Sequence, residues 1–449
     1  MKKIVLLIIT ILIIHTNMKA QTWYALANGT SDYTYTVCAD TNLNMMYAGG
    51  AFVIANGLTS NFAAKWNGSV WDNLGMDMGS NYSMIGTSDT VKSYCVYNNT
   101  LYVGGKFLQA EGFTAKHIAK YNGVDFSNVG TGTNRDVLAM AVYNGDLYAG
   151  GKFDSAGGVS CNHIAKWDGT SWTPVGSGLN NEVRALYVWN NNLYAGGLFD
   201  SAGTVACSRI AKWDGSNWTA LGTGITTDTS MTNQGLTAAV NAIGSYGNEL
   251  FVGGMFHTAG GNADTNLAKW NGTFWSGIGT FGNNTGDYVG SICTYLGNLF
   301  VGGSFITANA DTVHNIAKWD GNLITDLLHG SNGPIVSMTV MGGALFVGGH
   351  FTGVGTINAF NVARWAEPAG INEINDNISV SIYPNPANES IQIIINDRSS
   401  LVKIKDVLGN TILSTYDRNL SVKNLAQGIY MVEISNAKGI QKMVKFIKI

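Results

Sequence analysis

The sequence has few charged residues, and they form no basic stripe. Asp, Glu, Lys and Arg make up 12% of the 449 residues, and the formal net charge is −3. The charged share is about half of that in an ordinary globular protein. A nucleic-acid-binding surface needs lysine and arginine gathered on one face. The sequence therefore predicts no nucleic acid among the partners.

Proline is also rare, with 5 residues against 57 glycines, whereas 19 tyrosines, 17 phenylalanines and 12 tryptophans are present. Aromatic side chains favour strands, and glycine favours tight turns. The composition is typical of an all-β protein with many short strands.

Long apolar runs are absent except for residues 4–14, which follow Lys2 and Lys3. Eleven residues are too few to span a bilayer as a helix. A positive start, a short apolar run and a small residue at Ala20 are typical of a signal peptide, which we assign to residues 1–20. No later segment is apolar enough for a membrane helix, so we expect an exported chain without a membrane span.

Cysteine is scarce and occurs in no metal-binding pattern, because no CxxC or Cys/His pair is present. The odd number leaves at least one cysteine unpaired. Cys38, Cys95 and Cys293 occupy the same strand position in three repeats, and we interpret them as small buried hydrophobes. Cys161 and Cys207 occupy matching loop positions and are the one pair that could form a disulfide.

An internal repeat dominates the sequence. The pattern Gly-Gly-x-Phe occurs seven times, and fourteen residues after each Phe an aromatic residue closes an Ala-Lys/Arg-aromatic triplet. These structural aromatics are Trp66, Tyr121, Trp167, Trp213, Trp270, Trp319 and Trp365. A constant inner spacing with variable joints indicates one structural unit repeated along the chain.

The third copy predicts four strands. They cover residues 137–143, 147–151, 163–167 and 172–175, with Asn144-Gly145 and Asp168-Gly169 as tight hairpin turns. Four antiparallel strands repeated seven times predict a seven-bladed β-propeller over residues 21–365. The seventh copy stops at Trp365, while residues 22–27 match the fourth-strand pattern. We therefore expect this N-terminal strand to close the last blade.

The repeats resemble the kelch family. Each has a hydrophobic first strand, a Leu-Tyr-x-Gly-Gly type second strand and two spaced aromatics, as in Trp167 and Trp172. The resemblance covers about residues 22–365 and implies a kelch-like propeller without implying a ligand. The hairpin between the two aromatics is shorter here than is usual in kelch repeats.

After Trp365 the repeat ends. Residues 366–378 read as a linker, and residues 379–449 predict a second domain, a small Ig-like β-sandwich. Its expected strands are 379–383, 391–395, 402–407, 429–434 and 443–447.

Short motifs in this tail resemble the type A sorting domain of type IX secretion in Bacteroidota. The matching residues include Tyr383, Pro384, Asn385, Pro386, Gly409, Gly428, Tyr430 and Lys445. The resemblance implies the type IX secretion machinery as a partner, passage across the inner and outer membranes, and a secreted or cell-surface location. An ordinary adhesive sandwich is the alternative.

No set of residues predicts an active site. His117 and His163 occupy the repeat position that holds Arg209, Asn266, Asn315 and Asn361 in other copies. Metal ligands do not exchange with arginine and asparagine, so we expect a hydrogen-bonding role at the start of a strand. The sequence predicts no catalytic residue, no metal site and no cofactor.

Two hypotheses for function stay open. In the first, the propeller is a non-catalytic binding or adhesion module for a polysaccharide or surface protein. In the second, it is a secreted hydrolase or lyase acting on glycans. Any ligand is expected on the face with the longer connections, near 76–91, 222–240 and 280–289. The alternative is that these connections bind nothing and are ordinary polar surface loops. Asp, Glu, His or Tyr gathered in a central channel would favour the enzyme, and small or amide residues the binding module.

Overall fold

The computed structural model describes residues 21–74, 89–111, 113–227, 235–282, 284–309, 311–367, 380–395, 401–406, 410–435 and 441–449. The chain divides into two compact units, Met1–Pro368 and Ala369–Ile449. The predicted signal peptide and most of the predicted linker lie outside the described residues, and the domain boundaries stay predictions. Within the described part of the chain every regular element is a strand.

The described residues of the first unit form seven four-stranded antiparallel sheets, which we number in chain order. Sheet 1 contains β2 (Thr34–Asp40), β3 (Met45–Gly50), β6 (Ala63–Trp66) and β7 (Trp71–Asn73). Sheet 2 contains β8 (Thr90–Tyr97), β9 (Thr100–Lys106), β12 (Ile118–Tyr121) and β13 (Phe126–Asn128). Sheet 3 contains β14 (Val137–Tyr143), β15 (Asp146–Gly151), β18 (Ile164–Trp167) and β19 (Trp172–Pro174). Sheet 4 contains β20 (Val183–Trp189), β21 (Asn192–Gly197), β24 (Ile210–Trp213) and β25 (Trp218–Ala220).

The remaining three sheets repeat this order. Sheet 5 contains β27 (Ala239–Tyr246), β28 (Glu249–Met255), β31 (Leu267–Trp270) and β32 (Trp275–Gly277). Sheet 6 contains β33 (Tyr288–Tyr295), β34 (Asn298–Ser304), β37 (Ile316–Trp319) and β38 (Ile324–Asp326). Sheet 7 contains β39 (Ile335–Met341), β40 (Ala344–Gly349), β43 (Val362–Ala366) and β1 (Thr22–Ala25). The four strands predicted for the third copy are confirmed to within one residue at their ends.

The N-terminal strand completes sheet 7. Trp23 pairs with Trp365 and Ala25 with Ala363, and the two indoles meet with ring centroids 5.1 Å apart. The indole N–H of Trp23 also donates to the carbonyl of Leu327 in sheet 6 at 2.8 Å. The predicted pairing of residues 22–27 with the strand ending at Trp365 is thereby confirmed over β1.

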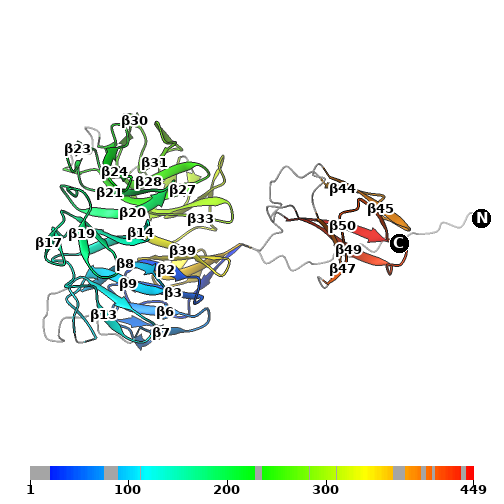
Figure 1. The fold of residues 1–449 in the computed structure, drawn as a ribbon, viewed down its shortest axis with the longest axis horizontal. Helices are drawn as coiled ribbons and strands as arrows, with labels where there is room; N and C mark the ends of the chain where they lie inside the picture. Colours follow the sequence, from blue (N-terminus) through cyan, green and yellow to red (C-terminus); the bar gives the residue numbers. More distant parts are fainter. Residues whose placement is uncertain are drawn as a thin grey trace, which may run out of the picture. The chain divides into compact units, whose positions relative to one another are not determined.

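The first strands of the sheets contact one another in a ring. Neighbours along the chain are in contact from β2 through β8, β14, β20, β27, β33 and β39, and β39 in turn contacts β2. In Figure 1 the first strands β14, β20 and β39 lie toward the middle of the unit, whereas β7 and β13 lie toward its outside. The arrangement is all-β and propeller-like.

The glycine pairs permit this close approach. A Cβ built on Gly104 would lie 2.7 Å from the side chain of Val137, which begins the first strand of the next sheet. No real Cβ fits at that distance, so each sheet needs a glycine where its neighbour packs against it.

The repeated aromatics lie in the core at the end of each third strand. Trp167 pairs with Trp172 across the hairpin with ring centroids 5.3 Å apart, and other sheets repeat the pair. The fourth-strand indole then donates to a carbonyl of the preceding sheet, as Trp172 does to Val129 at 3.0 Å. The aromatics thus pack within a sheet and tie neighbouring sheets together.

In each sheet, the described residues between the second and the third strand form a two-stranded hairpin. These seven hairpins were not predicted from the sequence. They are β4–β5 (Ile54–Ala55, Leu58–Thr59), β10–β11 (Gln109–Ala110, Phe113–Thr114), β16–β17 (Ser155–Ala156, Val159–Ser160), β22–β23 (Ser201–Ala202, Val205–Ala206), β29–β30 (Thr258–Ala259, Asn262–Ala263), β35–β36 (Thr307–Ala308, Asp311–Thr312) and β41–β42 (Gly353–Val354, Ile357–Asn358). A further strand, β26 (Ile225–Thr226), pairs with β29. Strands of two residues are too short to show alternation.

All five cysteines are free. Cys161 and Cys207 lie in different hydrophobic clusters, so the disulfide considered between them is not present. Burial raises the pKa of Cys161 to about 12 and that of Cys207 to about 11, which keeps both thiols protonated. Cys38, Cys95 and Cys293 are partly buried against hydrophobic clusters, as expected for small apolar residues.

The second unit contains two antiparallel sheets that share one hydrophobic cluster. One sheet contains β44 (Val380–Tyr383), β45 (Ser390–Ile395) and β48 (Asn419–Ser421). The other contains β46 (Leu401–Lys405), β47 (Thr411–Thr415), β49 (Gly428–Ser435) and β50 (Gln441–Lys448). All five predicted strands are present, and β47 and β48 were missed because their exposed residues carry no clear apolar alternation. The Ig-like assignment stays a prediction.

Candidate functional site: the mouth of the axial cavity

A β-bulge near the start of each first strand presents one residue to the centre of the ring. In sheet 3 the pairing passes from Val137 to Ala139 and leaves Leu138 unpaired. The equivalent residues are Tyr35, Lys92, Leu138, Arg184, Asn241, Gly290 and Val336. Bulges re-aim side chains and are common beside binding sites. We call these seven residues the bulge ring.

The bulge ring lines an axial cavity. Its outer part has a volume of about 530 Å³ and is lined by residues of all seven sheets. These are Tyr35, Lys92, Asp136, Leu138, Lys152, Glu182, Arg184, Ala239, Asn241, Met255, Tyr288 and Val336. We call this part the mouth. A deeper part of about 280 Å³ shares most of the bulge ring with it. The mouth is within the size range of small-ligand sites.

The mouth lies on the face with the longer connections. Val137 pairs with Gly151 and Gly150 pairs with Ile164, so the first strand starts where the second ends and the third starts. Asp136 and Lys152, which flank this end, both line the mouth. This is the face on which the sequence analysis expected a ligand. Residues 75–88 and 228–234 of the longer connections lie outside the described residues.

One side of the mouth is aromatic. The rings of Tyr33 and Tyr35 stack with centroids 5.6 Å apart, and Tyr33 stacks on His350 of sheet 7 at 3.6 Å. Burial raises the pKa of Tyr288 in sheet 6, and the nearby phenols of Tyr33 and Tyr35 raise it further. Burial likewise raises the pKa of Tyr35. The phenols of Tyr35 and Tyr288 therefore stay neutral at physiological pH, and each can offer a hydroxyl to a ligand.

Lys92 lies next to this aromatic side. Its ammonium sits over the ring of Tyr35, 3.1 Å from the centroid, in a cation–π contact between sheets 1 and 2. Burial, and then the nearby charge of Lys152, lower the pKa of Lys92 to about 8. A lysine with a lowered pKa in a cavity is a candidate functional group.

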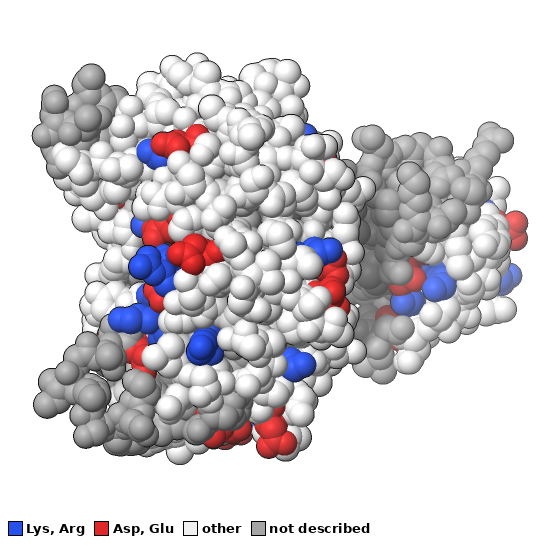
Figure 2. All heavy atoms as spheres, turned by 60° about the vertical axis from the view of Figure 1, so that its left-hand side comes forward, with Lys and Arg blue, Asp and Glu red and all other residues white. Residues whose placement is uncertain are grey.

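The other charged groups of the mouth are paired. The guanidinium of Arg184 contacts Glu182, with Nε donating to Oε1 at 2.6 Å, and Nη1 donates to Asn241 at 3.2 Å. Lys152 lies 3.7 Å from Asp136, whose other oxygen lies 3.8 Å from the imidazole of His117. Each carboxylate is therefore already opposed by a cation. The face shown in Figure 2 is mostly uncharged, and acidic and basic groups lie side by side on it.

The repeated asparagines have the hydrogen-bonding role that was expected, whereas Nδ1 of His117 and of His163 is buried without a hydrogen bond. His117, His163 and Asn266 all adopt a left-handed backbone at the entry to the third strand. Asn266 accepts from the amide of Phe256 at 3.0 Å and donates to the carbonyl of Phe281 at 2.8 Å, which ties two segments together. The proximity of His117 to Asp136 was not foreseen.

The repeated lysines of the third strands lie away from the mouth and pair with acids. Lys166 meets Asp146 at 2.9 Å, and Lys269 meets Glu249 at 2.8 Å. These ion pairs link the third strand to the second, so the lysines have a structural role within the sheets.

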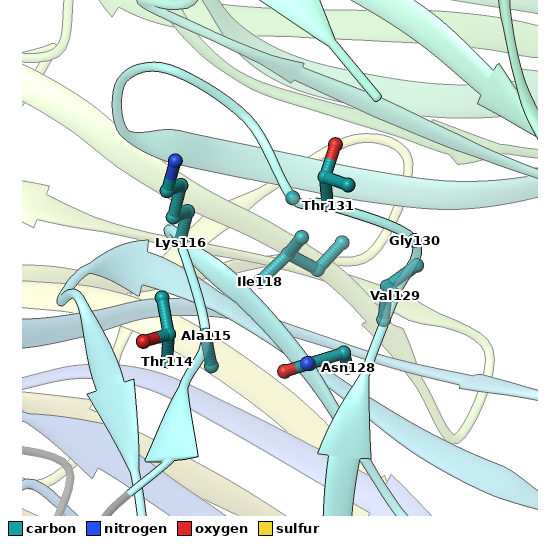
Figure 3. Close-up of a pocket in the computed structure, with 9 residues that line it drawn as sticks. Thr114, Ala115, Lys116, Ile118, Asn128, Val129, Gly130 and Thr131 are labelled. Atoms are coloured by element: carbon teal, nitrogen blue, oxygen red, sulfur yellow. The ribbon is translucent and has the colours of Figure 1, made fainter. Parts of the chain in front are cut away.

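A second, smaller pocket of about 250 Å³ lies between β12 and the segment after β13, and it offers little chemistry. Figure 3 shows its lining of short side chains and backbone, in which Lys116 is the only charged residue. The Lys116 carbonyl accepts from the Thr133 amide at 3.0 Å, which fixes the connection. We interpret this pocket as a packing gap.

Four residues of the predicted sorting motif lie in or beside the last strand of the second unit, namely Asn385, Gly428, Tyr430 and Lys445. Asn385 donates to the carbonyl of Lys445 at 3.1 Å and accepts from the amide of Ile447 at 2.9 Å. Tyr430 is buried, stacks on Phe446 and donates to the carbonyl of Ala426 at 3.0 Å. Pro384 and Pro386 flank Asn385, Tyr383 is exposed at the end of β44, and Gly428 begins β49. Gly409 lies outside the described residues. A role of each residue in sorting stays a prediction.

Sequence reasoning missed the bulge ring. A signal was present: each first strand contains a fully buried Thr, Val or Ile, then one variable residue, then a small residue. Seven different residue types occupy the variable position. Position-by-position alignment of the copies therefore identifies it.

No group of three or more His, Cys, Asp or Glu residues that could hold a metal occurs in the described ranges. Over the same ranges, nothing helical has the length and apolar character that crossing a bilayer requires.

Comparisons with solved structures give distant likenesses. PorZ, an essential bacterial surface component of the type IX secretion system of Porphyromonas gingivalis, is 14% identical with a TM-score of 0.44, and the alignment covers 94% of this chain and 60% of PorZ. The extracellular domain of the one component system BT4673 from B. thetaiotaomicron is 12% identical with a TM-score of 0.46, over 95% of this chain and 59% of that one. The designed protein Ika8 is 12% identical with a TM-score of 0.43, over 93% and 98%. The chain thus spans about 60% of the length of the first two proteins.

Sequence comparison assigns the tail. No curated protein matches the sequence closely enough to count as a relative. Residues 381–449 match the family model of the secretion system C-terminal sorting domain. The type IX sorting tail predicted from the sequence is thereby confirmed, and the protein is one secreted to the cell surface or the extracellular space.

Proposed function

We propose that residues 21–365 form a seven-bladed, kelch-like propeller that acts as a non-catalytic binding or adhesion module. Residues 379–449, joined by the linker 366–378, deliver it to the cell surface through the type IX secretion machinery. The ligand, a polysaccharide or surface protein, is held at the mouth of the axial cavity. No cofactor takes part.

The bulge ring is the observation that carries this proposal. The residues on either side of each bulge repeat around the molecule, because they hold the sheets together. The bulge residues do not repeat, and tyrosine, lysine, leucine, arginine, asparagine, glycine and valine each occur once. A purely structural ring would repeat its residue type. Six different side chains and one glycine on a rigid scaffold instead suit recognition of an asymmetric ligand.

The charges of the mouth favour binding over catalysis. Asp136 and Glu182 are each opposed by a cation at 3.7 Å or closer, as described above. A general acid or base needs a group whose proton is free to move at working pH. Pairing of this kind instead holds both carboxylates in place and engages their oxygens with cations.

A secreted glycan-active hydrolase or lyase is the second candidate. Two carboxylates, two tyrosines and Lys92 face one cavity from several sheets, which is the arrangement that the sequence analysis associated with an enzyme. The pKa of Lys92, lowered to about 8, adds a group able to accept a proton.

A saccharide array probed with the full chain separates the two candidates. We expect retention of at least one saccharide class, loss of retention in a Tyr35→Ala/Arg184→Ala variant, and no new reducing or unsaturated ends. Release of new ends would establish the enzyme instead. Retention that survives the double substitution would place binding away from the mouth and contradict the proposal.

A further inference from the structure

The two sides of the mouth differ in chemistry. Sheets 1 and 6 contribute the aromatic side with Tyr35 and Tyr288, and Tyr33, which stacks on His350, packs against Tyr35. Sheets 2, 3 and 4 contribute the charged side, where Lys92, Lys152 and Arg184 outnumber Asp136 and Glu182 by one. The mouth therefore carries an excess positive charge in a protein whose net charge is −3.

Lys92 is the cation that remains for a ligand. Arg184 is held by Glu182 and Asn241, and Lys152 lies beside Asp136. Among the described residues Lys92 has no ion pair, and its ammonium rests on the ring of Tyr35. Because Lys92 and Tyr35 touch, an anionic group bound to the ammonium would lie directly beside the aromatic side.

Resting on the proposed function, we propose that the mouth binds an acidic saccharide, with a sugar ring against Tyr288, a sugar hydroxyl on the phenol of Tyr35 and the carboxylate on Lys92. The flat ring of Tyr288 matches the C–H face of a pyranose, and the hydroxyls of Tyr288 and Tyr35 can hydrogen-bond to the sugar. A charge-assisted hydrogen bond to the carboxylate selects the acidic sugar over the neutral one.

Other ligand classes use only part of this surface. A small inorganic anion would leave the aromatic side and most of the roughly 530 Å³ empty. A neutral sugar would leave the ammonium of Lys92 without an anionic partner. A nucleic acid needs a wide basic surface, whereas this mouth carries two carboxylates and one excess cation.

Matched ligands test the proposal by isothermal titration calorimetry on the full chain. The probes are oligomers of galacturonate, glucuronate and mannuronate, each paired with its methyl ester, which removes the charge and keeps the sugar. We expect at least one acid to bind at least tenfold more tightly than its ester.

Lys92→Met should abolish this preference, Lys92→Arg should keep it, and Tyr35→Ala should weaken acid and ester alike. Lys120→Met, on a third strand away from the mouth, should change neither affinity, and thermal unfolding checks that each variant folds.

The outcomes separate the ligand class from the function. No binding across the acidic panel, equal binding of acid and ester, or a preference that survives Lys92→Met would overturn the acidic-saccharide proposal. If the ester binds as well as the acid and Tyr35→Ala weakens both, the mouth is still the binding site and the proposed function stands. If neither Lys92→Met nor Tyr35→Ala changes the affinity, the ligand does not bind at the mouth, and the proposed function is contradicted as well.

Discussion

At the residue scale, one repeat position shows how a buried charge acts on stability. Asp264 occupies the position of Cys161, Cys207 and Val313 in other sheets, and it is buried with one carboxylate oxygen lacking a hydrogen-bond partner. Burial raises its pKa. A folded-state pKa above the unfolded value disfavours folding at neutral pH, and this penalty disappears as pH falls below the unfolded pKa.

We therefore expect Asp264→Val to stabilise the protein at pH 7 by about 1–3 kcal/mol, the cost of an unsatisfied buried polar group. The gain should shrink as pH falls toward the ordinary carboxyl pKa, in thermal unfolding followed from pH 7 to pH 4. Cys207→Val, which removes no carboxylate from the same position, should show no such pH dependence. A gain from Asp264→Val that is constant with pH would contradict the explanation.

The lowered pKa of Lys92 predicts that ligand binding depends on pH. With its pKa lowered to about 8, the ammonium is present at pH 6–7 and is lost as pH rises above 8. The groups around it are Tyr35, Lys106, Asp136 and Lys152, and they include both signs of charge. Affinity for an acidic saccharide should therefore fall between pH 7 and pH 9, and in Lys92→Arg it should stay constant because arginine remains charged. Equal pH profiles for the two proteins would show that Lys92 is not the titrating group.

At the element scale, β1 joins the two ends of the first unit. Trp23 is buried, its indole donates to Leu327, and its ring meets that of Trp365. Trp23→Ala removes this packing and should destabilise the first unit by about 3–5 kcal/mol. Denaturant unfolding measures the change, and Tyr24→Ala on the same strand, at a partly exposed position, should cost much less. Equal losses from the two substitutions would mean that Trp23 does not anchor the strand.

The elements also show what sequence could and could not predict. The strands of the third copy, the glycine pairs and β1 followed from a repeat whose inner spacing is constant, because packing between sheets tolerates no change there. The bulge ring did not follow, because a bulge is a change of pairing between two strands and leaves no periodic apolar signal. The grouping of Lys92, Asp136 and Tyr288 is likewise a product of the ring, since these residues are far apart in the chain.

At the scale of the whole molecule, the two units have separate hydrophobic clusters, and the proposed function gives them separate tasks. Deletion of residues 369–449 should change the Tm of the first unit by no more than about 2 °C. We expect the deletion to alter its free energy of unfolding by about 0.5 kcal/mol or less, which corresponds to a Tm shift of that size. The same deletion should abolish appearance of the protein outside the cell, measured by fractionation and immunoblotting. A truncated chain that unfolds, or one that still reaches the surface, would contradict this division of labour.

The central claim is that the ligand occupies the mouth of the axial cavity, and the amine of Lys92 can report on it directly. The full chain is labelled with an amine-reactive reagent at pH 7.5, with and without a saturating concentration of a saccharide that it retains, and modification of each lysine is quantified by mass spectrometry. With its pKa near 8, a substantial fraction of Lys92 is unprotonated and reactive at this pH. We predict that the saccharide lowers labelling of Lys92 at least fivefold and leaves that of Lys120 and Lys212 unchanged. Undiminished labelling of Lys92 in the saturated protein would show that the ligand binds elsewhere.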